Sequence, residues 1–151
     1  MTNIIHTIYL GNKHNAHDDV FIKANNIKYI INITLDIPNK YNNITYYNYN
    51  IEDSCENVIQ KYFNDITSII NNNKNNNILV HCRVGKSRSA TVILAYLMKY
   101  ENMTLKKSLD FVKSKKNIQP NICFFDNLIK YEYDIYKCNS ITLSEYINKN
   151  D

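Results

Sequence analysis

Residues Ile78 to Ser89 read ILVHCRVGKSRS, and this stretch decides the fold. It starts with three consecutive apolar residues, as in a short buried strand, and it leads into a nearly all-apolar helix predicted over Ser89 to Tyr100. A loop with one glycine, Gly85, joins the two. Ligands of α/β proteins bind where the carboxyl end of a strand meets the N-terminus of the next helix. The sequence therefore predicts an anion site in this loop.

The loop combines a thiol with positive charge. A thiol close to a helix N-terminus and a guanidinium has a lowered pKa, so Cys82 is expected to be a thiolate and a nucleophile toward a bound phosphate. Arg88 offers a planar pair of donors to two equatorial oxygens of a phosphoryl transition state, which lysine could not match. His81 is expected to fix the loop through a backbone hydrogen bond. The Ser89 hydroxyl is expected to stabilise the thiolate when it leaves.

The remaining chain shows strands and helices in alternation, followed by helices alone. The predicted strands are Ile4 to Leu10, Ile27 to Ile33, Ile44 to Ile51 and Ile78 to Val80. The predicted helices are Asp18 to Asn26, Val58 to Ile70, Ser89 to Tyr100, Leu105 to Lys115 and Asn121 to Lys137. This order predicts one α/β domain, with a central, mostly parallel, twisted sheet of four to five strands flanked by helices. We expect the domain to span residues 1–138, with a polar C-terminal tail over residues 139–151.

The composition is that of a globular protein. The 151 residues are 44% hydrophobic and 21% charged, which is too apolar for intrinsic disorder. The net charge of +4 would attract anions but falls short of a nucleic-acid-binding signature, so nucleic acid is not expected as a partner. The start lacks a secretory signal, and the longest apolar run, Ala90 to Met98, is too short to span a bilayer. We expect no membrane contact and a cytoplasmic location, in the host cytoplasm or the virion if the source is viral.

The thiols and imidazoles outside the loop are scattered. The four cysteines are Cys55, Cys82, Cys123 and Cys138. Without a CxxC pair they predict neither a zinc site nor a disulfide framework, and they favour a reducing compartment. Cys55 is expected to be a half-buried small apolar residue, or alternatively to pair with an oxidised Cys82. His14 and His17 beside Asp18 could be metal ligands, but a capped helix end is the preferred interpretation. No metal and no cofactor are expected.

The segment HCRVGKSRS resembles the CX5R signature loop of cysteine-dependent protein phosphatases, in the Ser-Arg-Ser form typical of dual-specificity enzymes. Further similarities are Ile8 to Asn12, Ala95 to Met98, and Pro120-Asn121 followed by Phe124, so the resemblance covers about Ile4 to Tyr133. Three segments are most similar in sequence to the poxvirus-encoded members: Asn32 to Asp36, Lys61 to Ile66 and Ile93 to Met98. The chain is rich in Asn, Ile, Lys and Tyr, which would fit an AT-rich poxvirus.

This resemblance implies a role for each residue of the loop. Cys82 would be the nucleophile, Arg88 the phosphate clamp and Ser89 the hydroxyl that assists thiolate departure. The phosphate cradle would consist of Arg83, Val84, Gly85, Lys86, Ser87 and Arg88, with His81 in support. The family's general acid lies a fixed step before a Tyr/Phe-Phe pair. That register points to Asp53, ahead of Tyr62-Phe63, with Glu52 and Glu56 as neighbouring alternatives.

The implied activity is hydrolysis of phosphotyrosine and phosphoserine/phosphothreonine through a cysteinyl-phosphate, with phosphoproteins as partners. A phosphatase acting on RNA 5′ ends or phosphoinositides is an alternative, although the Ser-Arg-Ser ending argues against it. A pseudophosphatase that only binds phosphoproteins is another, although Cys82, Asp53 and Arg88 are all present. Val84 stands where many relatives have Ala. A homodimer is possible but not implied.

Overall fold

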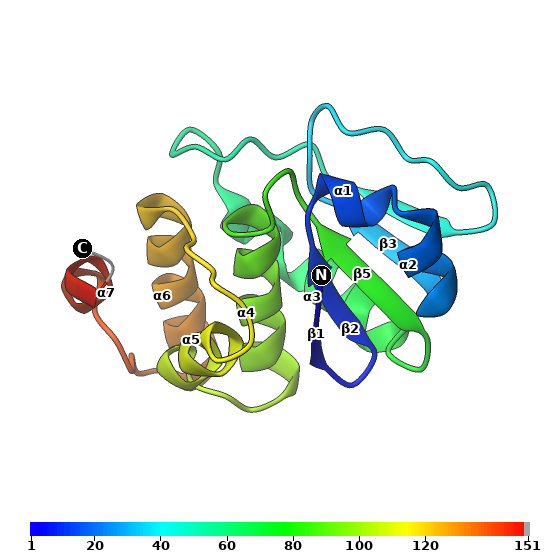
Figure 1. Cartoon of the computed structure of the whole chain (residues 1–151). Helices are drawn as coiled ribbons and strands as arrows, with labels where there is room; N and C mark the ends of the chain where they lie inside the picture. The colour runs from blue at the N-terminus through cyan, green and yellow to red at the C-terminus, as the bar shows by residue number, and fades with distance from the viewer. Residues whose placement is uncertain (150–151) are drawn as a thin grey trace.

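The computed structural model describes residues 1–149 as one α/β fold (Figure 1). Its strands are β1 (Thr2–Ile5), β2 (Ile8–Gly11), β3 (Ile27–Asn32), β4 (Thr45–Asn48) and β5 (Asn77–His81). Its helices are α1 (Lys13–Ala16), α2 (Asp19–Ala24), α3 (Phe63–Asn72), α4 (Arg88–Tyr100), α5 (Leu105–Lys113), α6 (Ile122–Tyr136) and α7 (Leu143–Lys149), and the 3-10 helix η1 (Ile59–Tyr62) precedes α3.

The five strands form one sheet in the order β1-β2-β5-β3-β4. Strands β2, β5, β3 and β4 run parallel, and β1 pairs antiparallel with β2. The predicted α/β class and mostly parallel sheet are therefore confirmed. The predicted single strand over Ile4 to Leu10 is wrong: it is a hairpin, because His6 takes a positive φ of 49° and turns the chain.

Side chains of the central strands alternate between two apolar layers. Leu79 and Ile30 face a small cluster with Ile22 under α1 and α2, whereas Val80 and Ile31 face the main core. This alternation is the period of two that a strand imposes. Figure 1 shows α1 and α2 on one side of the sheet and α3 to α6 on the other. Both faces are covered, as the continuous apolar runs of β3 and β5 require.

Helix α4 occupies the centre of the main core. Every residue from Arg88 to Met98 is buried, because α4 packs against the sheet on one side and against α3, α5 and α6 on the others. A helix that is apolar all round is buried in this way. The burial fixes the position of its first turn, which carries Arg88 and Ser89 beside the end of β5.

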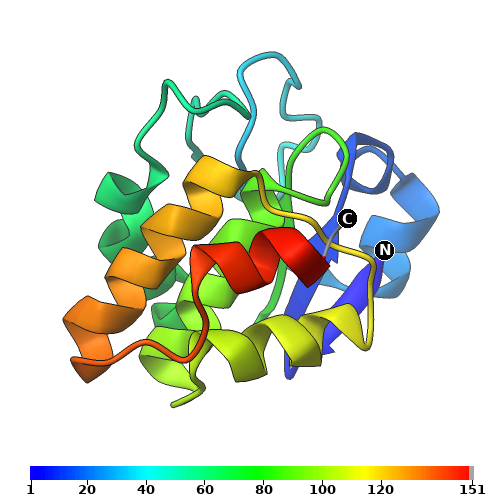
Figure 2. The same cartoon turned by 90° about the vertical axis from the view of Figure 1, so that its left-hand side faces the viewer.

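Residues 139–149 differ from the polar tail that the sequence predicts. They include α7, and Ile141 and Tyr146 are 2% exposed. The Tyr146 ring stacks on Phe125 with 3.6 Å between ring centroids, and Figure 2 shows α7 lying beside α6. The apolar residues Ile141, Leu143, Tyr146 and Ile147 span only about two helical turns, which gives too weak a periodicity to reveal this helix. Residues 150 and 151 lie outside the described part.

Within residues 1–149, no helix combines the length and the apolarity that a membrane crossing needs.

Candidate active site

Residues 82–87 form the Cys82 loop, which joins β5 to α4 at the carboxyl edge of the sheet. Strand β5 is central, between β2 and β3, so the loop leaves from the middle of that edge. The loop carbonyls of Arg83 and Lys86 accept hydrogen bonds from the backbone N–H groups of Lys13 (3.1 Å) and Gln119 (2.8 Å). Anchoring carbonyls to the surroundings leaves loop N–H groups to face inward, as an anion cradle requires.

Gly85 is required by the shape of the loop. Its φ is +80°, which favours glycine, and a Cβ there would lie 2.7 Å from the carbonyl oxygen of Gly11. The Gly85 N–H donates to the Cys82 sulfur at 3.2 Å, so this glycine also supplies a backbone donor to the thiol.

The Cys82 sulfur is surrounded by hydrogen-bonding groups. The residue is 2% exposed, and its Sγ lies 3.1 Å from Ser89 Oγ and 3.2 Å from the Gly85 nitrogen. It also precedes the N-terminus of the 13-residue helix α4, whose dipole favours negative charge. The predicted nucleophile and its predicted hydroxyl partner are thus in hydrogen-bonding contact.

Arg88 is held in the first turn of α4 with its guanidinium only partly used. Its Nη1 donates to the carbonyl oxygen of Ile51 at 2.9 Å, and the residue is 9% exposed. Its Nε is buried and has no hydrogen-bond partner within residues 1–149. Buried donors without a partner are rare in folded proteins. An anion in the Cys82 loop would satisfy this one.

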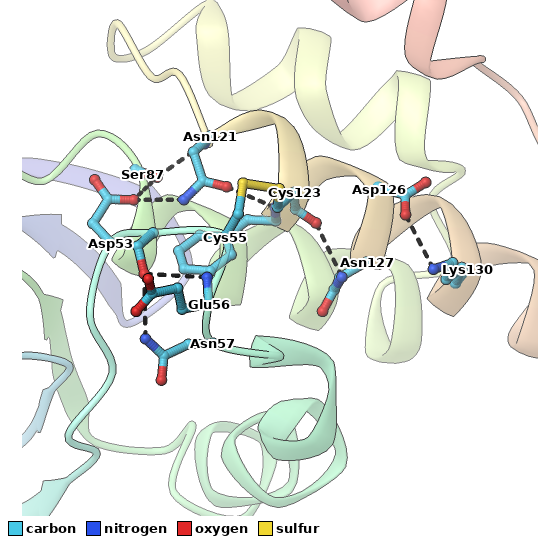
Figure 3. Close-up of a disulfide and its surroundings, with 12 residues drawn as sticks. Asp53, Cys55, Glu56, Asn57, Ser87, Asn121, Cys123, Asp126, Asn127 and Lys130 are labelled. Atoms are coloured by element: carbon cyan, nitrogen blue, oxygen red, sulfur yellow. Dashed lines mark hydrogen bonds and ion pairs between the residues drawn. A yellow bond between two sulfur atoms is a disulfide. The ribbon is translucent and has the colours of Figure 1, made fainter.

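Asp53 lies in the segment between β4 and η1, residues 49–58, which we call the acid loop. Its Oδ1 accepts hydrogen bonds from Ser87 Oγ (2.7 Å) and Asn121 Nδ2 (2.8 Å), as Figure 3 shows. Neither Glu52 nor Glu56 makes a comparable bond to the Cys82 loop in the described part of the chain. Of the three acidic residues, Asp53 is therefore the one held against the Cys82 loop, and it is also the one that the spacing to Tyr62-Phe63 selects.

The two residues that hold Asp53 are not predicted by the sequence to do so. The sequence predicts Ser87 only as part of the phosphate cradle, whereas its hydroxyl also accepts a hydrogen bond from the Asn121 backbone N–H at 3.0 Å. Asn121 enters the sequence prediction only through its Pro-Asn similarity to the family. Its position just before an apolar helix was the available signal, because it marks an N-cap whose side chain could also reach outward.

The side chains at the rim of the loop point in different directions. The Arg83 guanidinium is ion-paired with Asp36, and the phosphate-binding role of the residue stays a prediction. Val84 is 59% exposed, and Lys86 is also exposed. The rim thus offers one apolar and one basic side chain to solvent.

His81 supports the loop from within the core. It is 1% exposed, and its Nδ1 lies 3.4 Å from the carbonyl oxygen of Cys82, so that nitrogen carries the hydrogen in this contact. Burial lowers the pKa of His81 to about 4, and Arg88 and His17 contribute in the same direction. The imidazole is therefore neutral near pH 7.

Lys116 is a further basic neighbour of the loop. A Cβ on Gly85 would lie 2.8 Å from Lys116 Nζ, so the ammonium packs against the loop. Burial lowers the pKa of Lys116, while the nearby Cys82 acts in the opposite direction. Lys116 is half-buried and adds a positive charge beside the Cys82 loop.

The cysteine predictions need correction. Cys55 and Cys123 form a disulfide with Cα atoms 5.3 Å apart, and Cys82 and Cys138 are free. The predicted absence of a disulfide, the half-buried free Cys55 and the alternative Cys55–Cys82 pairing are therefore wrong, because Cys55 is exposed and bonded to Cys123. The two bonded residues are 68 positions apart, and only the packing of the acid loop on α6 brings them together. Their spacing could not reveal this.

The preferred interpretation of the histidines near α2 is confirmed. The Asp18 side chain accepts from the Phe21 N–H at 3.1 Å and caps the helix, and His17 Nε2 contacts the Pro38 carbonyl oxygen at 2.7 Å. No cluster of three or more His, Cys, Asp or Glu residues suited to a metal occurs within residues 1–149.

Comparisons with known proteins agree with this geometry. The family model "Dual specificity phosphatase, catalytic domain" matches residues 8–134. Human dual specificity protein phosphatase 21 is 30% identical over 146 residues, which are 94% of this chain and 77% of that protein. The "MAP kinase phosphatase with leucine-rich repeats protein 3" of Dictyostelium discoideum is 34% identical over 150 residues, covering 96% of this chain but 17% of that longer protein.

Solved structures show the same fold. The crystal structure of DUSP15 superposes with a TM-score of 0.85 at 27% identity, over 100% of this chain and 96% of that one. OH1 from the Orf virus, described as a tyrosine phosphatase with triple substrate specificity, has a TM-score of 0.72 at 21% identity, over 86% and 84% of the two chains. At that identity the likeness shows the fold alone, so the closeness to poxvirus members stays a prediction. The matched domain, the Cys82 loop and the fold place this chain in the dual specificity phosphatase family.

Proposed function

We propose that this chain hydrolyses phosphotyrosine and phosphoserine/phosphothreonine in proteins through a cysteinyl-phosphate on Cys82. The observation that carries the proposal is the environment of the Cys82 sulfur, which lies 3.1 Å from Ser89 Oγ and 3.2 Å from the Gly85 nitrogen beside the buried guanidinium of Arg88. The same place provides a nucleophile and donors for phosphate oxygens.

In the first step, the Cys82 thiolate attacks phosphorus and the bond from phosphorus to the ester oxygen breaks. Asp53 donates its proton to that oxygen, so the substrate leaves as a neutral phenol or alcohol. Both hydrogen bonds to Asp53 fall on Oδ1, which fixes the carboxyl group and leaves Oδ2 to carry the proton. Arg88 Nε and the loop N–H groups hold the phosphoryl oxygens.

In the second step, water attacks the cysteinyl-phosphate and the bond from phosphorus to sulfur breaks. Asp53, now a carboxylate, accepts a proton from the attacking water, which restores the acid for the next cycle. The electron pair returns to sulfur, where the Ser89 hydroxyl at 3.1 Å can donate to the departing thiolate. Inorganic phosphate is released, and the residues involved supply every proton transfer.

Phosphoproteins as substrates are supported by the names of the relatives and by the exposed rim of Val84 and Lys86. No observation in the site favours RNA 5′ ends or phosphoinositides, so these enter as outcomes of the test. A cytoplasmic location and a viral source are further proposals, which rest on the composition and the resemblance of the sequence.

The test uses one purified sample assayed against phosphotyrosine and phosphoserine peptides, a phosphoinositide and a triphosphate-ended RNA. We expect both peptides to be hydrolysed in the presence of a strong chelator, with competition by vanadate. Cys82→Ser should abolish turnover while substrate still binds, because the cradle is intact. Near-wild-type activity in Cys82→Ser would refute the mechanism, and hydrolysis of only the RNA or the lipid would refute the substrate class.

A further inference from the structure

Each cysteine of the disulfide lies close in sequence to Asp53 or to the residue that holds Asp53. Cys55 follows Asp53 by two residues, and Cys123 follows Asn121 by two residues. The bond therefore joins the acid loop to the first turn of α6 next to the place where Asn121 Nδ2 donates to Asp53 Oδ1 at 2.8 Å. Figure 3 shows Asp53, Ser87 and Asn121 grouped beside the sulfur bridge.

Asn121 is itself fixed by the helix. Its Oδ1 accepts from the Phe124 N–H at 2.8 Å and caps α6, and its own N–H donates to Ser87 Oγ at 3.0 Å. The amide that holds Asp53 thus has little freedom. The position of Asp53 is then determined by how closely the acid loop is kept against α6.

The acid loop makes few other contacts with the rest of the protein near Asp53. Ile51 and Ile59 are buried at either end, but Glu52, Asp53, Cys55, Glu56 and Val58 are exposed. Within the described part of the chain, the other loop and side-chain hydrogen bonds of residues 52–58 stay inside the segment, such as Ser54 N–H to the Glu52 carbonyl at 3.0 Å. The hydrogen bond from Asn121 to Asp53 is exposed and the one from Ser87 is only partly buried, so both compete with water. Among residues 1–149, the disulfide is the one covalent link between the side chains of the acid loop and α6, and it keeps Asp53 and Asn121 at high effective concentration.

We propose that the Cys55–Cys123 disulfide is a positioning element for Asp53, so that its reduction selectively slows protonation of the leaving group. This inference rests on the proposed role of Asp53 as general acid. Cys55 is exposed and Cys123 is half-buried, so a dithiol can reach the bond. The dithiol supplies two electrons and two protons, the S–S bond becomes two thiols, and the dithiol becomes a disulfide. Cys82 and its cradle are not altered by this step.

The experiment measures how kcat/KM depends on the leaving group. All proteins carry Cys138→Ser, which removes the exposed free thiol and leaves Cys82 as the free cysteine of the oxidised form. Four samples are compared: the oxidised protein, the same protein reduced by a dithiol, the Cys55→Ser/Cys123→Ser variant and Asp53→Asn. The substrates are phenyl phosphate, whose leaving group needs a proton, and 4-nitrophenyl phosphate, whose leaving group needs little help.

We expect reduction and the double substitution to lower kcat/KM on the order of tenfold for phenyl phosphate and less than about twofold for 4-nitrophenyl phosphate. Vanadate affinity should not change, because the Cys82 loop keeps its contacts. Asp53→Asn should show the same selectivity with a larger loss. Cys138→Ser alone should match the unmodified chain and serves as the control.

Two results would overturn the inference. If the reduced protein keeps the leaving-group dependence of the oxidised one, the disulfide does not position Asp53. If both substrates lose the same factor, the bond has only a general structural role. If the proposed role of Asp53 were itself wrong, the result would differ from both of these. Asp53→Asn would then lower kcat/KM equally for phenyl phosphate and 4-nitrophenyl phosphate. Should the double variant fail to fold, the comparison of oxidised and reduced protein still decides the question.

Discussion

Glu132 in α6 is a buried carboxylate whose removal should cost much of the stability. It is 1% exposed and accepts four hydrogen bonds from two chain segments. The donors are Leu105 N–H (2.7 Å), Ser140 N–H (2.9 Å), Ser140 Oγ (2.6 Å) and Asn139 Nδ2 (3.3 Å). Glu132 therefore ties the start of α5 and the segment leading to α7 onto α6.

The change to test is Glu132→Ala. The fully buried Leu105 N–H loses its partner at about 1–3 kcal/mol, and the two half-buried Ser140 donors lose charge-assisted bonds worth about 1 kcal/mol each after partial hydration. Exposed Asn139 can turn to water. We expect a loss of about 3–5 kcal/mol in the free energy of unfolding, which for a chain of this size lowers Tm by about 6–20 °C.

Urea unfolding under non-reducing conditions measures this loss, with the disulfide intact in both proteins. Asp126→Ala is the matched control on the same helix, since its ion pair with Lys130 at 3.1 Å is partly exposed and should be worth about 0.5 kcal/mol or less. Glu132→Gln should fall between the two, because one oxygen acceptor remains. If Glu132→Ala lost no more than the control, the four bonds would contribute no net stability and the reasoning would be refuted.

Two further predictions concern the Cys82 loop. Burial holds the pKa of His81 at about 4, below its ordinary value of 6.5, so the unfolded chain binds more protons between these values. The free energy of unfolding should fall as the pH drops from 6.5 toward 4, by up to about 3 kcal/mol from this residue, and urea titrations of His81→Gln should show a shallower fall. An unchanged slope in that variant would contradict the assignment. Arg88→Lys keeps the charge but loses the fork and the 2.9 Å bond to Ile51, so kcat/KM should drop on the order of 10²–10³. Steady-state assays with a phosphotyrosine peptide check this, and an activity within about twofold of the native chain would argue against an arginine clamp.

The sequence was most informative where one local pattern sets the structure. The apolar run of β5, the loop with Gly85 and the apolar stretch of α4 are contiguous, so strand, loop and helix could be predicted together. The Asp53 register could be predicted because a resemblance supplied the fixed step to Tyr62-Phe63. In each case the signal lies within about ten residues or in a family motif.

Contacts between distant segments could not be predicted. Cys55 and Cys123 meet because α6 packs beside the acid loop, and no spacing rule connects residues 68 positions apart. The contact of Lys116 with Gly85 likewise depends on where the chain after α5 returns to the Cys82 loop. Such contacts are fixed by tertiary packing, which a single sequence does not display.

The double use of Asn121 restricts which residue can stand there. Helix N-caps accept Asn, Asp, Ser or Thr almost equally, because each has an oxygen for the first-turn N–H groups. The bond to Asp53 Oδ1 needs in addition an N–H donor on a second atom, and among these four side chains only the amide of Asn has both. Replacing Asn121 with Asp, Ser or Thr should therefore leave helix α6 stable but still impair catalysis. At this position, the set of residues that permits folding should be wider than the set that permits turnover.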